Sequence, residues 1–116
     1  MTQITRPMPK PTAQVAHYVE VLGVDMTMQF LLRFGGAELY LSDDPKGRNA
    51  LEQFIGTDKA KELANHPSRA MQRRVPIANR WLAAMLQWQG HSTAHIARTL
   101  RVSDTTVRNW LKLVGR

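Results

Sequence analysis

The chain has 116 residues, of which 43% are hydrophobic, and it contains no cysteine. Its length predicts one domain or two very small ones, and the lack of cysteine excludes disulfide frameworks, thiol nucleophiles and cysteine-ligated zinc. No apolar run approaches the roughly 20 residues of a membrane span, and residues 1–11 lack the apolar core of a signal peptide. We therefore expect a soluble, cytoplasmic protein with no membrane partner.

The net charge of +7 is concentrated in the second half of the sequence. Residues 1–58 contain five basic and seven acidic residues, whereas residues 59–116 contain eleven basic and two acidic ones, a net of −2 against +9. Arginine outnumbers lysine eight to three in the second half, and its guanidinium suits phosphates and guanine edges. This asymmetry predicts that the second half binds a polyanion; the alternative is a basic surface that only keeps the protein soluble.

The chain is expected to begin with an arm followed by two helices. Residues 1–11 are rich in proline and predict a flexible arm. Thr12 is placed to cap a first helix that runs to Leu22 and stops at Gly23. Asp25 is placed to cap a second helix, which spans residues 26–34 and ends at a pair of glycines.

The second helix carries apolar residues almost all the way around, so we expect it to be buried or to lie at a subunit contact. Phe30 and Phe34 are the interface residues that this pattern favours. Residues 37–41 then alternate between apolar and polar side chains and predict the only strand. A lone strand is unstable in water, so it pairs either with an unrecognised segment of its own chain or with its copy across a two-fold axis. We favour the copy.

The middle of the chain carries turns and short helices. Residues 42–47 form a turn-rich loop, and two short helices are expected over 49–55 and over 57–65, the second capped by Thr57. We interpret residues 12–66 as a dimerisation region and residues 67–75 as a basic linker.

The last forty residues predict three short helices, which we interpret as a DNA-binding domain over 76–116. Pro76 and Gly90 punctuate the first helix, whose broad apolar face includes Trp81 and Trp88. Ser92 and Ser103 are placed to cap the second and third helices. The run Ile96-Ala97-x-x-Leu100-x-Val102-Ser103-x-x-x-Val107-x-x-Trp110-Leu111 reproduces the spacing of a helix-turn-helix. Arg101 departs from the usual helix-turn-helix pattern. Many such motifs have glycine at this position, because the residue there often adopts a left-handed conformation.

The third helix, 103–113, is predicted to enter the major groove of double-stranded DNA. With Val107, Trp110 and Leu111 facing inward, Arg108 is placed to contact guanine and Asn109 to contact adenine. Serine and threonine hydroxyls and further cations are expected to complete the DNA contacts: Ser92, Thr93, Ser103, Thr105, Thr106, Lys112, Arg73, Arg74 and Arg80. The alternative for each residue is an ordinary solvated side chain.

Catalytic and metal sites are not expected. His91 and His95 have the spacing of a metal pair but no third ligand nearby in the sequence. Asp43-Asp44 fits a turn better than a metal site. We therefore expect no cofactor, no metal and no enzymatic activity.

The chain as a whole resembles the Mor/C family of phage transcription activators over roughly residues 12–113. The resemblance rests on the run Phe34-Gly35-Gly36-x-x-Leu39-Tyr40-Leu41 followed by a C-terminal helix-turn-helix. It implies a homodimer that binds an inverted repeat near phage promoters and helps to recruit host RNA polymerase. It also implies that Leu39, Tyr40 and Leu41 lie in an intersubunit ribbon and that 103–113 is the recognition helix.

The expected protein is thus mainly α-helical, with one short β-strand, and it acts as a dimeric, sequence-specific regulator of phage or mobile-element genes. Activation and repression both remain open. Two alternatives place the same helix-turn-helix in a packaging factor similar to a phage terminase small subunit or in a DNA-binding accessory of a recombinase. Binding of single-stranded nucleic acid is disfavoured, because no exposed aromatic platform is evident.

Overall fold

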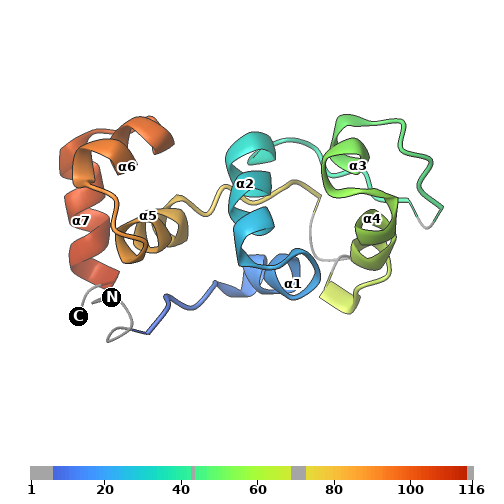
Figure 1. Cartoon of the computed structure of the whole chain (residues 1–116), viewed down its shortest axis with the longest axis horizontal. Helices are drawn as coiled ribbons and strands as arrows, with labels where there is room; N and C mark the ends of the chain where they lie inside the picture. The colour runs from blue at the N-terminus through green and yellow to red at the C-terminus, as the bar shows by residue number, and fades with distance from the viewer. Residues whose placement is uncertain (1–6, 43, 69–72, 115–116) are drawn as a thin grey trace. The chain divides into compact units, whose positions relative to one another are not determined.

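The computed structural model describes residues 7–42, 44–68 and 73–114, which contain seven helices and no extended strand. The described residues fall into two compact units, and Figure 1 shows the helices of each. The N-terminal unit, Pro11–Ile77, contains α1 (Ala13–Leu22), α2 (Val24–Phe34), α3 (Ala50–Ile55) and α4 (Thr57–Ala64). The C-terminal unit comprises the described parts of Met1–Lys10 and Ala78–Arg116, with α5 (Asn79–Trp88), α6 (Thr93–Leu100) and α7 (Asp104–Val114). None of these described helices is long and apolar enough to cross a membrane.

A chain of aromatic contacts runs through α1, α2 and α3 of the N-terminal unit, beside buried aliphatic residues that include Leu31 and Leu63. The Tyr18 ring lies 5.3 Å from Phe30, Phe30 lies 5.6 Å from Phe34, and Phe34 meets the edge of Phe54 at 5.7 Å. Tyr18 and Phe30 are fully buried, and burial raises the pKa of the Tyr18 hydroxyl. Phe30 is therefore packed inside its own chain and offers no surface to a partner, which corrects its expected place at a subunit contact.

Two helix starts differ from the sequence prediction because a glycine joins consecutive helices directly. Gly23 ends α1 and caps α2, with φ at 83°, and Gly56 does the same between α3 and α4 at 89°. The Gly23 N–H donates to Val19 and its carbonyl accepts from Thr27. Asp25 and Thr57, which were expected to cap, instead lie within the first turns of their helices.

The segment 37–41 is not a strand. It forms an isolated antiparallel bridge, Glu38 to Arg74, flanked by hydrogen bonds from the Leu39 N–H to the Arg73 carbonyl (3.0 Å) and from the Val75 N–H to the Ala37 carbonyl (2.9 Å). The expected intersubunit pairing is thus replaced on this edge by pairing within the chain. Residues 73–75 read Arg-Arg-Val and carry no alternation, so the hydrophobic pattern gave no signal for this partner.

The glycine pair after α2, Gly35 and Gly36, allows residues 73–77 to pack against the turn that follows α2. A Cβ atom on Gly35 would stand 2.6 Å from the Leu31 carbonyl oxygen and 3.4 Å from the backbone of Pro76 and Ile77. Gly36 adopts φ 87°, a conformation that glycine tolerates best, and its N–H donates to the Val75 carbonyl at 2.7 Å. Val75 is buried, so this segment belongs to the N-terminal unit.

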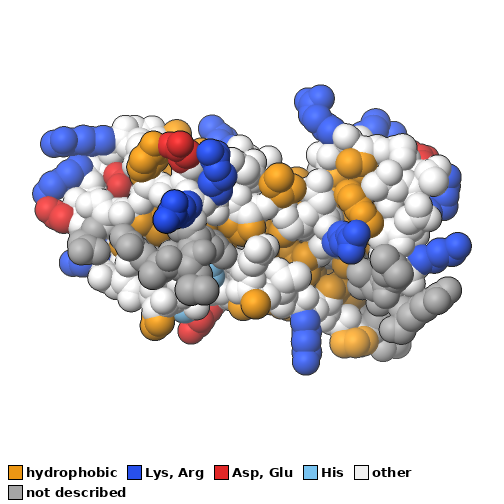
Figure 2. Space-filling view, turned by 180° about the vertical axis from the view of Figure 1, so that it is seen from behind, with side chains coloured by type: hydrophobic (Ala, Val, Ile, Leu, Met, Phe, Trp, Pro, Cys, Tyr) orange, Lys and Arg blue, Asp and Glu red, His pale blue; other side chains and the backbone are white. Residues whose placement is uncertain are grey.

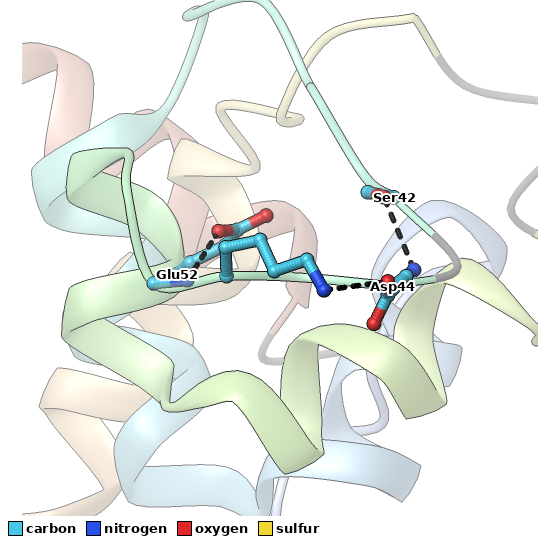
Figure 3. Close-up of polar contacts among 5 residues, drawn as sticks. Ser42, Asp44 and Glu52 are labelled. Carbon is cyan, nitrogen blue, oxygen red and sulfur yellow. Dashed lines mark hydrogen bonds and ion pairs between the residues drawn. The ribbon is translucent and has the colours of Figure 1, made fainter.

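The loop between the bridge and α3 is organised around Glu52, which is buried (Figure 3). The Glu52 N–H donates to the Asn49 side chain, while the Glu52 carboxylate accepts from the N–H groups of Gly47 and Arg48. The Asn49 side chain thus caps α3, and the Glu52 carboxylate holds the two residues that precede Asn49. Asp44 pairs with Lys46 at 2.7 Å in the same loop, and Asp43 lies outside the described residues.

A histidine pair links α1 to the end of α4. The ring of buried His17 lies 5.2 Å from that of His66, and His66 Nε2 is 2.9 Å from the Glu20 carboxylate. His17 Nδ1 has no hydrogen-bond partner among the described residues. Burial is the main cause that lowers the pKa of His17, and nearby His66 lowers it further, against the opposing effect of Glu20.

We predict that the N-terminal unit loses stability as the pH falls below the ordinary histidine pKa of 6.5. Because the folded pKa of His17 is lowered, unfolding takes up a proton in this range, and acid favours the unfolded state. Hydrogen exchange of the α1 and α2 amides, measured between pH 7.5 and 5, should show falling protection. His17→Phe should flatten this dependence and His91→Phe should not; an equal slope in His17→Phe would contradict the assignment.

Candidate nucleic-acid interface

Helices α5, α6 and α7 pack against one another around a small apolar core. Met85 of α5, Ile96 of α6 and Val107 of α7 are completely buried. Ala97 is also buried, and its small side chain suits a close crossing of α6 and α7. Trp110 and Leu111, which were expected inside, are only half-buried.

Serine side chains cap the starts of α6 and α7, and Arg101 and Ser103 flank the sharp turn between the two helices. The Ser92 hydroxyl accepts from the His95 N–H, and the Ser103 hydroxyl accepts from the Thr106 N–H, each at 3.1 Å. Arg101 ends α6 in the left-handed conformation, with φ 59° and ψ 45°, and the Val102 N–H donates back to the Ala97 carbonyl at 3.0 Å. This is the bonding of a Schellman motif, and it confirms the left-handed turn expected at Arg101.

The start of α5 differs from the sequence prediction. Pro76 lies outside the helix, which begins at Asn79 after Ala78 in a left-handed conformation (φ 53°). The reason is tertiary, because residues 73–75 pair with the turn after α2. Near the start of α5, the indole N–H of Trp81 donates to the Pro9 carbonyl at 3.3 Å. The described end of the expected flexible arm is therefore attached to the C-terminal unit.

The N-terminal part of α7 presents a polar face to solvent. Thr105, Arg108 and Asn109 are exposed, and Lys112 is exposed one turn further on. Ser103 is exposed and Thr106 is half-buried, with their hydroxyls 2.9 Å apart. This arrangement matches the expected surface, with Val107 on the buried side.

The remaining predicted contacts do not all belong to one unit. Ser92 and Thr93 lie at the start of α6, where serine and threonine hydroxyls and backbone N–H groups suit a phosphate. Arg80 is exposed on α5. Arg73 and Arg74 are exposed but belong to the N-terminal unit, and the Arg74 guanidinium donates to the Gly36 carbonyl at 3.2 Å.

The surface of the C-terminal unit is strongly basic. From Asn79 to Val114 it carries five Lys and Arg residues against one acidic residue, Asp104. Figure 2, which draws one face of the whole chain, shows Lys and Arg side chains projecting at many separate points. Arg98 and Arg101 are exposed cations of this unit that the helix-turn-helix spacing did not select, although the charge count had included them.

The two histidines near the start of α6 stack on each other, with ring centroids 4.5 Å apart. Among the described residues, no cluster of three or more His, Cys, Asp or Glu side chains is arranged to hold a metal ion.

Residues 74–114, which span α5 to α7, match the model of a protein family described as a homeodomain-like domain. The three helices in this range form a homeodomain-like helix-turn-helix domain, which begins at Ala78 in the structure. Such domains bind DNA through their last helix, which here is α7. No curated protein and no solved structure matches the chain, and nothing in these comparisons confirms the Mor/C resemblance.

We predict that Arg101→Gly stabilises the helix-turn-helix domain by up to about 1 kcal/mol, because glycine adopts φ 59° without the steric cost that arginine carries. All three tryptophans lie in this domain, so denaturation followed by tryptophan fluorescence reports its stability. Arg98→Gly, in the interior of α6, is the matched control and should destabilise the domain. A lower denaturation midpoint for Arg101→Gly would refute this account.

Proposed function

We propose that the protein is a sequence-specific transcription regulator that binds double-stranded DNA through α7 in the cytoplasm of a bacterial or phage-infected cell and has no enzymatic activity. The observation that carries this proposal is the exposed row of Thr105, Arg108 and Asn109 at the N-terminal end of α7, opposite the buried Val107. A helix-turn-helix normally places this part of its last helix against base edges.

The chemistry of the row fits base reading. The Arg108 guanidinium suits the O6 and N7 atoms of guanine, and the Asn109 amide suits the N6 and N7 atoms of adenine. Thr105 and Thr106 suit a thymine methyl group or a phosphate. Ser92, Thr93, Lys112 and Arg80 suit the phosphate backbone, which fixes the position of the domain without reading sequence.

We further propose that two copies of the chain bind an inverted repeat. Glu38 and Arg74 face each other in the bridge, and the hydrogen bonds are made by the residues on either side of them. In such a pair the backbone N–H and C=O groups of each residue point away from the other residue. Those of Glu38 therefore lie on the outer edge of the bridge. Tyr40 is 66% exposed beside it, and Leu39 and Leu41 are half-buried. A second copy can pair on this outer edge, and the half-buried side chain of Phe34 remains a candidate interface residue.

The phage or mobile-element origin rests on the Mor/C resemblance of residues 34–41. The same resemblance is the basis for proposing host RNA polymerase as a partner. Both activation and repression are compatible with the polar face of α7.

We predict that Arg108→Ala weakens binding to the selected site by about 1–3 kcal/mol, a loss of roughly 5- to 150-fold, while sparing most non-specific binding. Arg98→Ala is the matched control, because it removes the same positive charge from an exposed position on α6. The site comes from selection in a random duplex library with the purified protein at two salt concentrations. If the affinities for the selected site and for random DNA fell equally, Arg108 would contact only a phosphate. Weak, salt-sensitive binding with no consensus sequence would refute sequence-specific reading.

We predict that Tyr40→Asp separates the dimer, because a carboxylate on the outer edge sets two negative charges against each other across the two-fold axis. Light scattering should give twice the chain mass of 13.2 kDa for the parent protein and the chain mass for the variant. Gln53→Asp, at an exposed position of α3, should leave the dimer intact. A parent mass of one chain would contradict the dimer, and a large ring would favour the packaging alternative.

A further inference from the structure

The chain passes between its two compact units at two places. Pro11 begins the N-terminal unit and Ile77 ends it, whereas residues 7–10 belong with the helix-turn-helix domain that begins at Ala78. The helix-turn-helix domain is thus connected at Lys10–Pro11 as well as at Ile77–Ala78. The two connections lie 67 residues apart in the sequence, from position 11 to position 77 inclusive.

The first connection is short and held at both ends. On the side of the helix-turn-helix domain, the Pro9 carbonyl accepts from the indole N–H of Trp81, whose side chain is buried. On the other side, the Thr12 carbonyl accepts from the N–H groups of Val15 and Ala16 at 3.0 and 2.9 Å. Only Lys10 and Pro11 lie between these anchors. Proline fixes its own φ and restricts the backbone of the residue before it, which reduces the number of backbone torsions that can vary in this connection.

The second connection is equally short. Val75 is buried and exchanges backbone hydrogen bonds with Gly36 and Ala37. Beyond it, the Ala78 carbonyl accepts from the Leu82 N–H at 3.0 Å and so belongs to the first turn of α5. Only Pro76 and Ile77 lie between these anchors, and Gly35 packs closely against both.

Two short connections restrict motion in a way that one does not. A domain on one short tether can swivel about a point, whereas a second short tether restricts motions other than turning about the line that joins the two tethers. The Trp81–Pro9 hydrogen bond is what makes the first connection short, because without it the tether would extend into the residues before Pro9.

We propose that the Trp81–Pro9 hydrogen bond makes the two connections a two-point hinge, and that Trp81 and Pro9 are positioning residues for DNA recognition. The inference rests on the proposed function, a dimer that reads an inverted repeat. In that dimer the hinge limits the distances that two copies of α7 can adopt, so it sets the spacing between half-sites that the protein accepts.

The hinge is first tested without DNA. The chain has no cysteine, so two introduced cysteines can be spin-labelled selectively. Lys61→Cys on α4 and Arg98→Cys on α6 replace exposed residues, one in each unit. The distribution of distances between the two labels is measured with unlabelled chain in excess. Trp81→Phe removes the N–H donor and keeps an aromatic ring, and inserting Gly-Ser-Gly-Ser between Lys10 and Pro11 lengthens the tether with Trp81 unchanged. Both changes should broaden the distribution about twofold or more. The same insertion between Asp44 and Pro45, inside the N-terminal unit, should leave it unchanged.

The second measurement uses duplexes that carry the selected half-sites at centre-to-centre spacings varied by one and two base pairs. The parent protein should lose about 10-fold or more in affinity away from its preferred spacing, and the two hinge variants less than about threefold, with affinity for a single half-site unchanged. A merely structural role for Trp81 would lower single-site affinity instead. An unchanged distance distribution in the insertion variant overturns the hinge. A broadened distribution in a protein with no spacing preference upholds the hinge and refutes the proposed dimeric reader.

Discussion

The pairing of residues 73–75 with the turn that follows α2 is the constraint on which the rest of the structure depends. Its backbone bonds give the segment 37–39 a partner and bury Val75, and they end the N-terminal unit just before the helix-turn-helix domain begins. The pairing requires Gly35, because any larger residue would collide with the Leu31 carbonyl and press on the backbone of residues 76–77. It also displaces Pro76 from α5, so the first helix of the domain begins later than its punctuation indicates.

The helix-turn-helix domain combines a small apolar core with a cationic surface. Val107, Ile96 and Met85 hold three short helices together, and Asp104 is the one acidic residue from Asn79 to Val114. Such a balance favours a nucleic-acid phosphate backbone as the partner, because each cation that meets a phosphate releases a counterion. The residues suited to sequence reading, Arg108 and Asn109, lie on the solvent side of α7.

The N-terminal unit has a different design. A line of aromatic rings runs through it from Tyr18 to Phe54, and Gly23 and Gly56 join α1 to α2 and α3 to α4 without connecting loops. Buried His17 makes this unit sensitive to protonation, because burial lowers the pKa of its imidazole.

The sequence by itself determined the local features of the chain. The caps at Ser92 and Ser103, the left-handed turn at Arg101 and the inward position of Val107 follow from residues within one or two turns of one another. The exposed face of α7 follows from the same helical periodicity. Only the tertiary structure decided the partner of residues 37–39, the burial of Phe30 inside its own chain and the attachment of Pro9 to Trp81. These contacts join residues that are far apart in the sequence. A bridge of one residue pair, or one hydrogen bond from an indole N–H to a carbonyl, produces no periodic pattern in the sequence.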